Sequence, residues 1–229
     1  MALILNIDTS TENALVCLAK DGEVIDSLQN TNQKDHASFL QVAINVICKK
    51  NNIILKNIDA VAVTEGPGSY TGLRVGLASA KGICYALNKP LILLNTLKVI
   101  AYSAISSSAV FAKNNTALIC PMIDARRMEV FTAVYDKQLN EIISPCALIL
   151  NEQSFIEILE QSPILFVGNG AKKINLVQQT HFNIVLDEIN ASNTAISYLA
   201  NQSYVNQLFT SVIYSEPLYI KPFLNQTTL

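Results

Sequence analysis

The chain has 229 residues, of which half are hydrophobic and 15% are charged, and its formal net charge is −2 at neutral pH. This length is enough to bury a sizeable core in one large domain or two small ones. Basic residues cluster no further than adjacent pairs such as Arg126-Arg127, which excludes a chain that binds nucleic acid on its own through a basic patch.

The five cysteines are odd in number, irregularly spaced and mostly surrounded by apolar residues: Cys17, Cys48, Cys84, Cys120 and Cys146. This pattern favours reduced core residues over a disulfide framework or a metal cluster. The sequence enters an apolar segment at residues 3–7 without a basic region or cleavage site, and no apolar run is long enough to span a membrane. We therefore expect a cytoplasmic protein without a membrane anchor.

The first elements are predicted to be a strand at residues 3–7 and a hairpin of strands at 14–19 and 23–28. A helix follows at 36–50, and it has too many apolar residues for a single buried stripe. Either this helix is buried on two sides within its domain, or one side faces another protein.

A short strand at residues 60–64 leads through the Gly66-Pro67-Gly68 turn into a second helix. Small residues recur every four positions in this helix and line up as one smooth ridge: Gly72, Gly76, Ala80 and Cys84. Glycine costs roughly 1 kcal/mol relative to alanine in a helix interior. The ridge therefore predicts close approach of another backbone, either the domain's own sheet or a partner subunit.

A strand at 91–94 and a helix at 96–106 are followed by the best candidates for a domain boundary, the run Ser106-Ser107-Ser108 and the polar Lys113-Asn114-Asn115. Beyond it the pattern of the first half returns, with strands at 118–123, 130–135 and 141–144, a helix at 153–161, a strand at 164–167 and a helix at 193–207. At an offset of 116 residues, and without gaps, Ile7-Asp8 falls on Ile123-Asp124 and Leu15-Val16-Cys17-Leu18 falls on Phe131-Thr132-Ala133-Val134. We therefore expect two related α/β domains, residues 1–107 and 108–229.

Two aspartates in equivalent positions are the strongest candidates for chemistry. Asp8 and Asp124 each follow a strand, where a duplicated nucleotide-binding fold would hold Mg²⁺ near a phosphate. The alternative is that each carboxylate only caps its own turn. The turn at Gly168-Asn169-Gly170 could approach an adenosine in such a fold, although a plain turn explains it equally well.

Other catalytic arrangements are weaker. The Gly66 loop matches neither a P-loop nor a dinucleotide fingerprint. His36 and His181 are too far apart in sequence to predict a metal pair, and no serine has a nucleophile motif. Arg74 lies in an apolar neighbourhood, so it either extends its charged end to solvent or makes a specific ion pair.

Three segments of the chain are distinctive: residues 5–11 (Leu-Asn-Ile-Asp-Thr-Ser-Thr), residues 66–76 (Gly-Pro-Gly-Ser-Tyr-Thr-Gly-Leu-Arg-Val-Gly), and Ile123-Asp124-Ala125-Arg126 with Glu129-Val130. Together they resemble the bacterial TsaB (YeaZ-like) family, the accessory subunit of the threonylcarbamoyladenosine system, over essentially the whole chain. The resemblance implies an actin-like, sugar-kinase-like (ASKHA) fold of two duplicated α/β domains with ribonuclease H-like mixed sheets.

The resemblance implies that the chain supports a transfer without performing it. In this family the catalytic paralogue TsaD, with the ATPase TsaE, moves a threonylcarbamoyl group onto the tRNA adenosine next to the anticodon. The paralogue holds a metal ion with a pair of histidines, and the corresponding positions here are about Thr96 and Ile100, which cannot ligate a metal in that manner. The resemblance thus implies no catalytic residue, no metal and no cofactor of the chain's own, contact with tRNA only through the complex, and leaves ATP or ADP at the partner interface open.

The family's partner packs against the two helices that flank the central strand. The interface residues implied here are His36, Phe39, Leu40, Ala43, Ile47, Gly72, Val75, Gly76, Ser79 and Ala80. The same helices would form a homodimer when the partner is absent. The resemblance also implies a vestigial phosphate-binding site, formed by Asp8, Thr9, Ser10, Thr11 and Asp124.

Two rival hypotheses remain beside this one. The chain could be an actin-like phosphotransferase that uses Asp8 and Asp124 with Mg-ATP. It could also have the peptidase activity once attached to the M22 superfamily, although no metal pair or catalytic triad supports that role.

Overall fold

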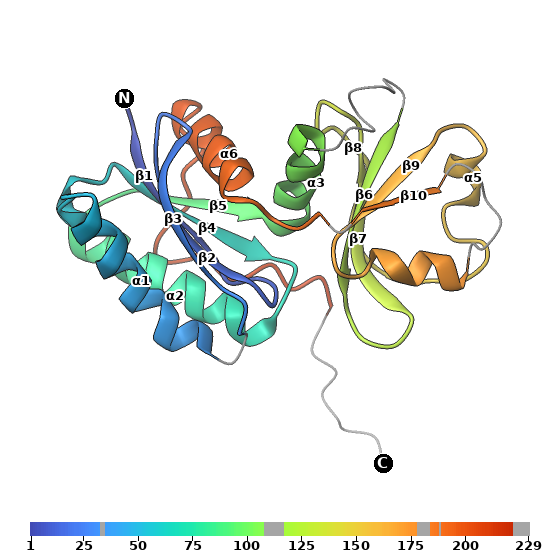
Figure 1. Cartoon of the computed structure of the whole chain (residues 1–229), viewed down its shortest axis with the longest axis horizontal. Helices are drawn as coiled ribbons and strands as arrows, with labels where there is room; N and C mark the ends of the chain where they lie inside the picture. The colour runs from blue at the N-terminus through green and yellow to red at the C-terminus, as the bar shows by residue number, and fades with distance from the viewer. Residues whose placement is uncertain (33–34, 108–116, 178–183, 188, 222–229) are drawn as a thin grey trace, which may run out of the picture.

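The structure is a computed structural model that describes residues 1–32, 35–107, 117–177, 184–187 and 189–221. It consists of two lobes that lie side by side, each built on a five-stranded sheet (Figure 1). The first sheet has the order β3-β2-β1-β4-β5. Its strands are β1 (Leu3–Asp8), β2 (Ala14–Lys20), β3 (Glu23–Asn30), β4 (Ala60–Gly66) and β5 (Leu91–Asn95).

The second sheet has the order β10-β9-β6-β7-β8. Its strands are β6 (Leu118–Asp124), β7 (Glu129–Tyr135), β8 (Glu141–Ile149), β9 (Ile164–Val167) and β10 (Ile184–Asp187). In both sheets three antiparallel strands are followed by two parallel ones. The predicted duplication of an α/β unit is therefore confirmed by the topology.

The predicted alignment of the two halves is wrong by one residue in the second strand. Asp8 is opposite Leu15 in the first sheet, whereas Asp124 is opposite Val130 in the second. The turn that joins the first two strands is one residue shorter in the second lobe. Sequence comparison without gaps could not detect this deletion because the strands on both sides are equally apolar.

Two helices cover one face of the first sheet, as Figure 1 shows. These are α1 (His36–Lys50) and α2 (Tyr70–Leu87), and the short 3₁₀ helix η2 (Leu55–Asn57) lies between them in sequence. α2 begins at Ser69, whose Oγ accepts the Gly72 amide, and ends at Asn88 in a left-handed conformation. Since β1 and β2 are buried on both faces, their sequences are almost continuously apolar.

The other face of the first sheet is covered by the last helix, α6 (Asn193–Val205), together with α3 (Thr96–Ser107). The rings of Tyr102 and Tyr198 stack between these two helices with centroids 4.4 Å apart. The sequence-based division at 107/108 assigned α6 to the second domain, but the structure places it on the first sheet. The first lobe is therefore built from two separate pieces of chain.

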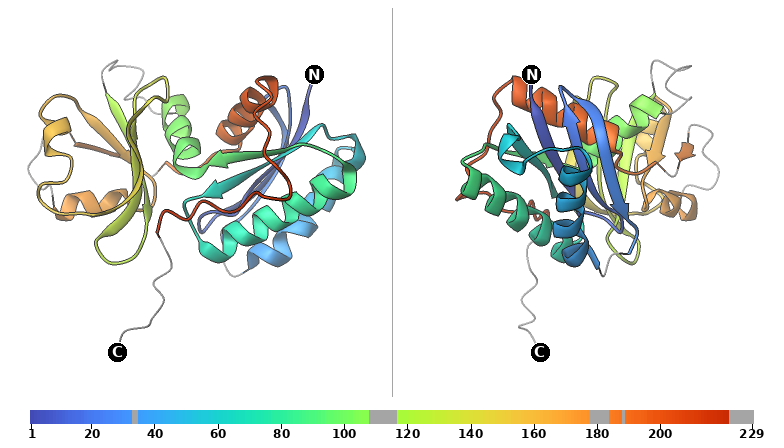
Figure 2. Two further views of the ribbon diagram at one scale, coloured as in Figure 1. Left: turned by 180° about the vertical axis from the view of Figure 1, so that it is seen from behind. Right: turned by 60° about the vertical axis from the view of Figure 1, so that its left-hand side comes forward.

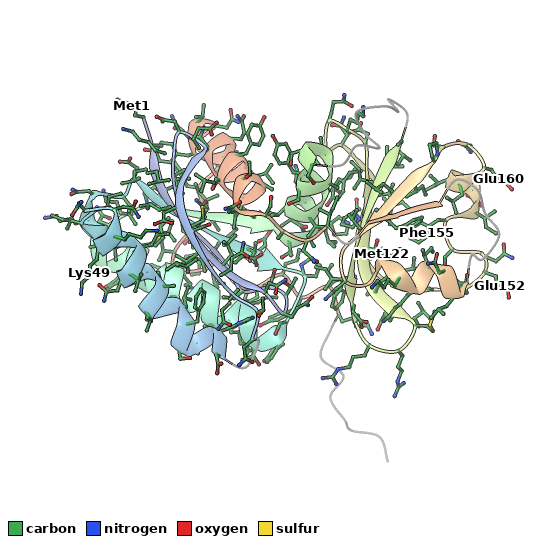
Figure 3. The ribbon with its side chains drawn as sticks, viewed as in Figure 1. Met1, Lys49, Met122, Glu152, Phe155 and Glu160 are labelled. Atoms are coloured by element: carbon green, nitrogen blue, oxygen red, sulfur yellow. The ribbon has the colours of Figure 1, made fainter. Side chains whose placement is uncertain are left out.

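The second sheet packs against α3 on one face and against short elements on the other. These are α5 (Ile156–Leu159) and the 3₁₀ helix η3 (Ala171–Leu176). The predicted helix at 153–161 is only one turn long, because Phe155 has a left-handed backbone that interrupts it. Figure 3 places Met122 and Phe155 inside this lobe and Glu152 and Glu160 at its outer end.

The chain after α6 runs back across the first lobe toward the space between the lobes (Figure 2). The Thr210 amide donates to the Leu91 carbonyl, and the Leu218 amide donates to the Glu65 carbonyl. Lys81 of α2 fixes the middle of this segment by donating to two of its carbonyls, those of Ile213 and Ser215. The segment therefore reaches the end of β4, where the lobes meet.

Four cysteines are buried, as the sequence predicted, and Cys146 is half-buried. Burial raises the pKa of the Cys17 and Cys84 thiols to about 11 and that of Cys120 to about 12. These thiols are protonated and unreactive at neutral pH. Within the described part of the chain, none of the helices is both long enough and apolar enough to cross a membrane.

Candidate functional site

A cleft of about 430 Å³ lies between the lobes. Four turns and the C-terminal segment contribute its lining: Ser10, Thr11, Glu12, Gly68, Ser69, Tyr70, Thr71, Ile123, Asp124, Ala125, Arg126, Phe131, Asn169 and Lys221. The strands β1, β4 and β6 all end at this cleft, which is where open α/β sheets place their ligands.

The turn after β1 forms the wall of the cleft in the first lobe. Thr9 is fully buried, and its Oγ1 donates to the Gly72 carbonyl at 2.7 Å. The Ser10 carbonyl accepts the Ser69 amide at 2.6 Å, and the Thr11 carbonyl accepts Nε2 of His36 at 3.0 Å. The turn is therefore bonded to both α1 and α2 on one side while it faces the cleft on the other.

The two candidate aspartates differ in exposure. Asp8 is 2% exposed, and its Oδ1 accepts the Ser10 amide, the Ser10 hydroxyl and the Thr64 hydroxyl. Asp124 is exposed in the cleft, where its Oδ1 accepts the Arg126 amide and lies 3.0 Å from Lys173 Nζ. Each carboxylate thus caps its own turn, as the alternative interpretation held. Of these two aspartates only Asp124 lines the cleft, so the pair on which the phosphotransferase hypothesis depends does not face the cleft together.

The turn after β6 presents two arginines at the lip of the cleft. Arg126 and Arg127 are both exposed and have positive φ angles of 67° and 49°. Left-handed backbone costs a residue with a Cβ on the order of 1–2 kcal/mol, and glycine or asparagine is the usual occupant. The local fold therefore gives no reason for arginine here.

Two contacts join the lobes across the cleft. Asn169 accepts the Asp124 amide through Oδ1 and donates to Glu12 Oε2 through Nδ2 at 2.7 Å. Lys221 at the end of the C-terminal segment pairs with Glu129 of the second lobe. The sequence pattern at Asn169 indicates only a plain turn or an approach to adenosine, because contacts this distant in sequence leave no local pattern.

Arg74 is exposed, and it packs on two tyrosines instead of forming an ion pair with any acidic side chain that the structure describes. Its guanidinium lies over the Tyr70 ring, 4.0 Å from the centroid, and its Nε donates to the Tyr219 hydroxyl at 2.9 Å. The two tyrosine rings are themselves 5.5 Å apart. Since Tyr70 lines the cleft, this cluster forms its edge on the side of the first lobe.

Most of the predicted partner-interface residues point into the protein. The following are buried between α1, α2 and their own sheet: His36, Leu40, Ala43, Ile47, Gly72, Gly76 and Ala80. A Cβ on Gly72 would lie 2.0 Å from the Thr9 carbonyl oxygen, and one on Gly76 would lie 2.3 Å from Thr9 Oγ1. The ridge therefore serves packing against the β1 turn, and the prediction that it meets a partner was wrong. Phe39, Val75 and Ser79 remain partly exposed.

A different set of small and apolar residues faces outward from the same two helices: Val42 and Val46 on α1, and Ala78, Gly82 and Ala86 on α2. We call these residues the outer face. Val42 is 61% exposed and Val46 is 43% exposed. A Cβ on Gly82 would meet nothing within 4 Å, so the chain itself contains no packing reason for this glycine. Most of the interface residues implied from the sequence thus belong to the buried side of each helix, and the outer face is a different set of residues.

Thr96 and Ile100, the positions that the resemblance implies for the paralogue's histidine pair, lie one turn apart on α3. Thr96 is fully buried, and Ile100 is 1% exposed within the core shared with the second sheet. Among the described residues no group of three or more His, Cys, Asp or Glu side chains is placed to hold a metal ion.

The duplicated sheets and the cleft between them define an actin-like α/β fold of the kind found in sugar kinases. An inorganic polyphosphate/ATP-glucomannokinase from Arthrobacter superposes on 90% of this chain and 100% of its own with a TM-score of 0.52 at 9% identity. A Pseudomonas aeruginosa protein described as similar to the peptidase YeaZ superposes on 96% of this chain and 100% of its own, with a TM-score of 0.81 at 22% identity.

The family model for TsaD, tRNA N6-adenosine threonylcarbamoyltransferase, matches residues 24–209. The Haemophilus influenzae "tRNA threonylcarbamoyladenosine biosynthesis protein TsaB" is 28% identical over 95% of this chain and 93% of its own length. The Escherichia coli protein of the same name is 33% identical over 61% of this chain and 57% of its own. The chain belongs to this family, in its TsaB/YeaZ branch.

Proposed function

We propose that this chain is the non-catalytic subunit that pairs with the TsaD-type catalytic paralogue and supports threonylcarbamoyl transfer to tRNA. A role in tRNA threonylcarbamoyladenosine biosynthesis follows from the family and from its named relatives. The proposal adds three points to that role: this chain pairs with a TsaD-type paralogue, it acts together with a TsaE-type ATPase, and it does not itself catalyse the transfer.

The outer face is the observation that carries the proposal. It combines two half-exposed or exposed valines with a row of small residues at every fourth position of α2, and Gly82 at its centre has no internal contact to explain it. A row of small residues lets another helix approach closely along it, and the exposed Tyr85 lies beside this row. A paralogue with the same fold would offer a matching pair of helices, and a second copy of this chain would do so when the paralogue is absent.

Two further observations support a non-catalytic role. Thr96 and Ile100 are buried in the core, where neither could present a metal ligand to a substrate. Asp8 uses its carboxylate in three hydrogen bonds within the chain, so the rival phosphotransferase has only Asp124 in the cleft. The family's implied ATP or ADP at the partner interface is not part of this proposal.

The test is threonylcarbamoyl transfer to tRNA by the catalytic paralogue and its ATPase, measured with and without this chain. We expect transfer only when the chain is added, and no transfer and no ATP turnover by the chain alone. ATP hydrolysis or transfer by the isolated chain, or full activity without it, would contradict the proposal.

A further inference from the structure

Two of the three arginines of the chain lie on the turn at the cleft, and the third stacks on a residue of the cleft lining. Thirteen of the sixteen basic residues are lysines spread over the sequence, whereas Arg74, Arg126 and Arg127 are the complete set of arginines. Arg126 lines the cleft, Arg127 follows it on the same turn, and Arg74 stacks on Tyr70, which lines the opposite edge. Arginine binds phosphates through a planar fork and stacks on rings, which lysine does not do.

The arginine side chains at the lip are available to a ligand. No acidic side chain in the described ranges pairs with Arg126 or Arg127. The carboxylates that line the cleft are already engaged, since Glu12 accepts from Asn169 and Asp124 pairs with Lys173. The lip therefore presents positive charge on a chain whose net charge is negative.

The arrangement fits an extended polyanion better than a small one. Arg126 and Arg127 project from the second lobe, while the Arg74–Tyr70–Tyr219 cluster belongs to the first lobe and the C-terminal segment. Tyr70 is 40% exposed, so a flat group can reach its edge of the cluster. Single-stranded RNA offers both chemistries, phosphates for the guanidinium groups and unstacked bases for an aromatic–arginine platform.

We propose that the lip of the cleft is a direct contact surface for the RNA substrate, with Arg126 and Arg127 on backbone phosphates and the Arg74–Tyr70 stack beside an unpaired base. This proposal rests on the proposed function, because it makes the chain part of the tRNA-binding surface of the complex. It goes beyond the expectation that tRNA is contacted only through the complex, because it names the surface of this chain that makes the contact. The chain alone binds RNA weakly, since the patch is small and the net charge is −2.

The experiment measures binding of a labelled, unmodified tRNA transcript to the complex of this chain with the catalytic paralogue, over a range of salt concentrations. The test variant is Arg126→Asn with Arg127→Asn, since asparagine tolerates the left-handed backbone of this turn. We expect the Kd to rise roughly tenfold and the slope of log Kd against log salt to fall by about 2, one for each phosphate contact. The variant should melt at the same temperature as the parent chain or higher.

The matched control removes the same two charges elsewhere. Lys20→Gln with Lys56→Gln changes exposed residues at the opposite ends of the strands from the cleft. The control should leave tRNA binding within about twofold, because charges beyond a Debye length of roughly 8–10 Å are screened. Equal weakening by both variants, or an unchanged Kd for the arginine variant, overturns the proposal.

A second variant separates charge from geometry. Arg126→Lys with Arg127→Lys should keep the salt slope while losing part of the affinity, since the charge stays and the fork is lost. If the asparagine variant instead loses co-elution with the paralogue, the arginines belong to a protein contact and the RNA proposal fails. If tRNA binding is unchanged but transfer still requires this chain, the proposed function stands without this inference, whereas a dispensable chain removes the proposed function itself.

Discussion

At the residue scale, three glycines of one helix have opposite surroundings. Gly72 and Gly76 of α2 allow the β1 turn to lie directly on the helix, so that Thr9 can donate to a helix carbonyl. Gly82 faces outward with empty space around the position of its missing Cβ. The same residue type thus serves internal packing at one end of the helix and is left without an internal purpose at the other.

Gly76→Ala and Gly82→Ala should therefore change stability in opposite directions. The first variant forces a methyl group against Thr9 and should destabilise the fold by about 1–3 kcal/mol. The second improves helix propensity without a clash and should stabilise the isolated chain by roughly 0.5–1 kcal/mol. Denaturant unfolding of the two variants against the parent measures both effects.

The variant Gly82→Ala also tests whether a partner helix binds at the outer face. If a partner helix approaches at Gly82, the alanine that stabilises the isolated chain should weaken pairing with the catalytic paralogue. Gly82→Ala with unchanged or tighter pairing would count against close approach at this position.

Sequence could predict the glycine ridge because a period of four residues identifies a helix face. It could not predict which backbone meets that face, since a sheet and a partner require the same small residues. The candidate aspartates have the same difficulty: the position after each strand was correctly identified, but the bonds to Ser10 and Thr64 that bury Asp8 depend on the folded turn.

At the element scale, α1 is fastened to β3 by a charged pair. Lys50 Nζ lies 2.8 Å from Asp26 Oδ2, and Asn51 Nδ2 donates to the same oxygen at 3.0 Å. The bond to Lys50, followed by the bond to Asn51, holds the pKa of Asp26 below its ordinary value. A depressed carboxylate pKa stabilises the fold above the unfolded pKa of about 3.9, and this stabilisation disappears as the pH falls through the folded pKa.

Asp26→Asn should therefore lower the free energy of unfolding by about 0.5–1 kcal/mol near neutral pH, because exposed or partly exposed ion pairs contribute stability of this order. The difference from the parent chain should shrink below about pH 4 and vanish in stronger acid, when Asp26 itself is protonated. Urea unfolding at several pH values measures the effect. Lys50→Gln should reproduce it, Lys49→Gln should not, and a cost that persists in acid would point to a cause other than the ion pair.

Elements with a strong hydrophobic period were predicted within a few residues, as for α1 and β1. The one-turn α5 was overestimated, because the backbone at Phe155 leaves no mark on the apolar pattern. The strand β10 was not predicted at all. The assignment of α6 to the second lobe failed because chain order carries no information on which sheet a late helix covers.

At the scale of the whole molecule, the outer face and the cleft lie on different sides of the β1 turn. That turn contacts α1 through His36 and α2 through Thr9 and Ser10, while Ser10 and Thr11 line the cleft. The proposed RNA contact at Arg126 and Arg127 therefore lies apart from the proposed pairing surface, whereas Arg74 and Ala78 line one hollow along α2. We expect a variant of the arginine turn to affect RNA contact without affecting pairing.

Ala78→Arg should abolish pairing with the paralogue and leave the fold intact, because Ala78 is exposed on the outer face. Ala80, two residues further along α2, is fully buried and would not be a suitable site for this change. An unpaired charge buried in an interface costs about 3–5 kcal/mol, so the Kd for the paralogue should rise by roughly 100-fold or more. Size-exclusion chromatography and a titration measure this change. Gln202→Arg on the exposed side of α6 adds the same charge away from the outer face and should still co-elute; co-elution of the Ala78 variant would show that the partner binds elsewhere.

The return of α6 and the C-terminal segment to the first lobe has a consequence for synthesis of the protein. The second lobe is complete in the chain before α6 has been made, whereas the face of the first sheet that α6 covers stays open, with Ile4, Cys17 and Ile92 uncovered. During synthesis on the ribosome, the lobe whose first strands are made first is therefore the lobe whose core is completed last. A chain released before residue 193 leaves the α6-covered face of its first sheet exposed to water.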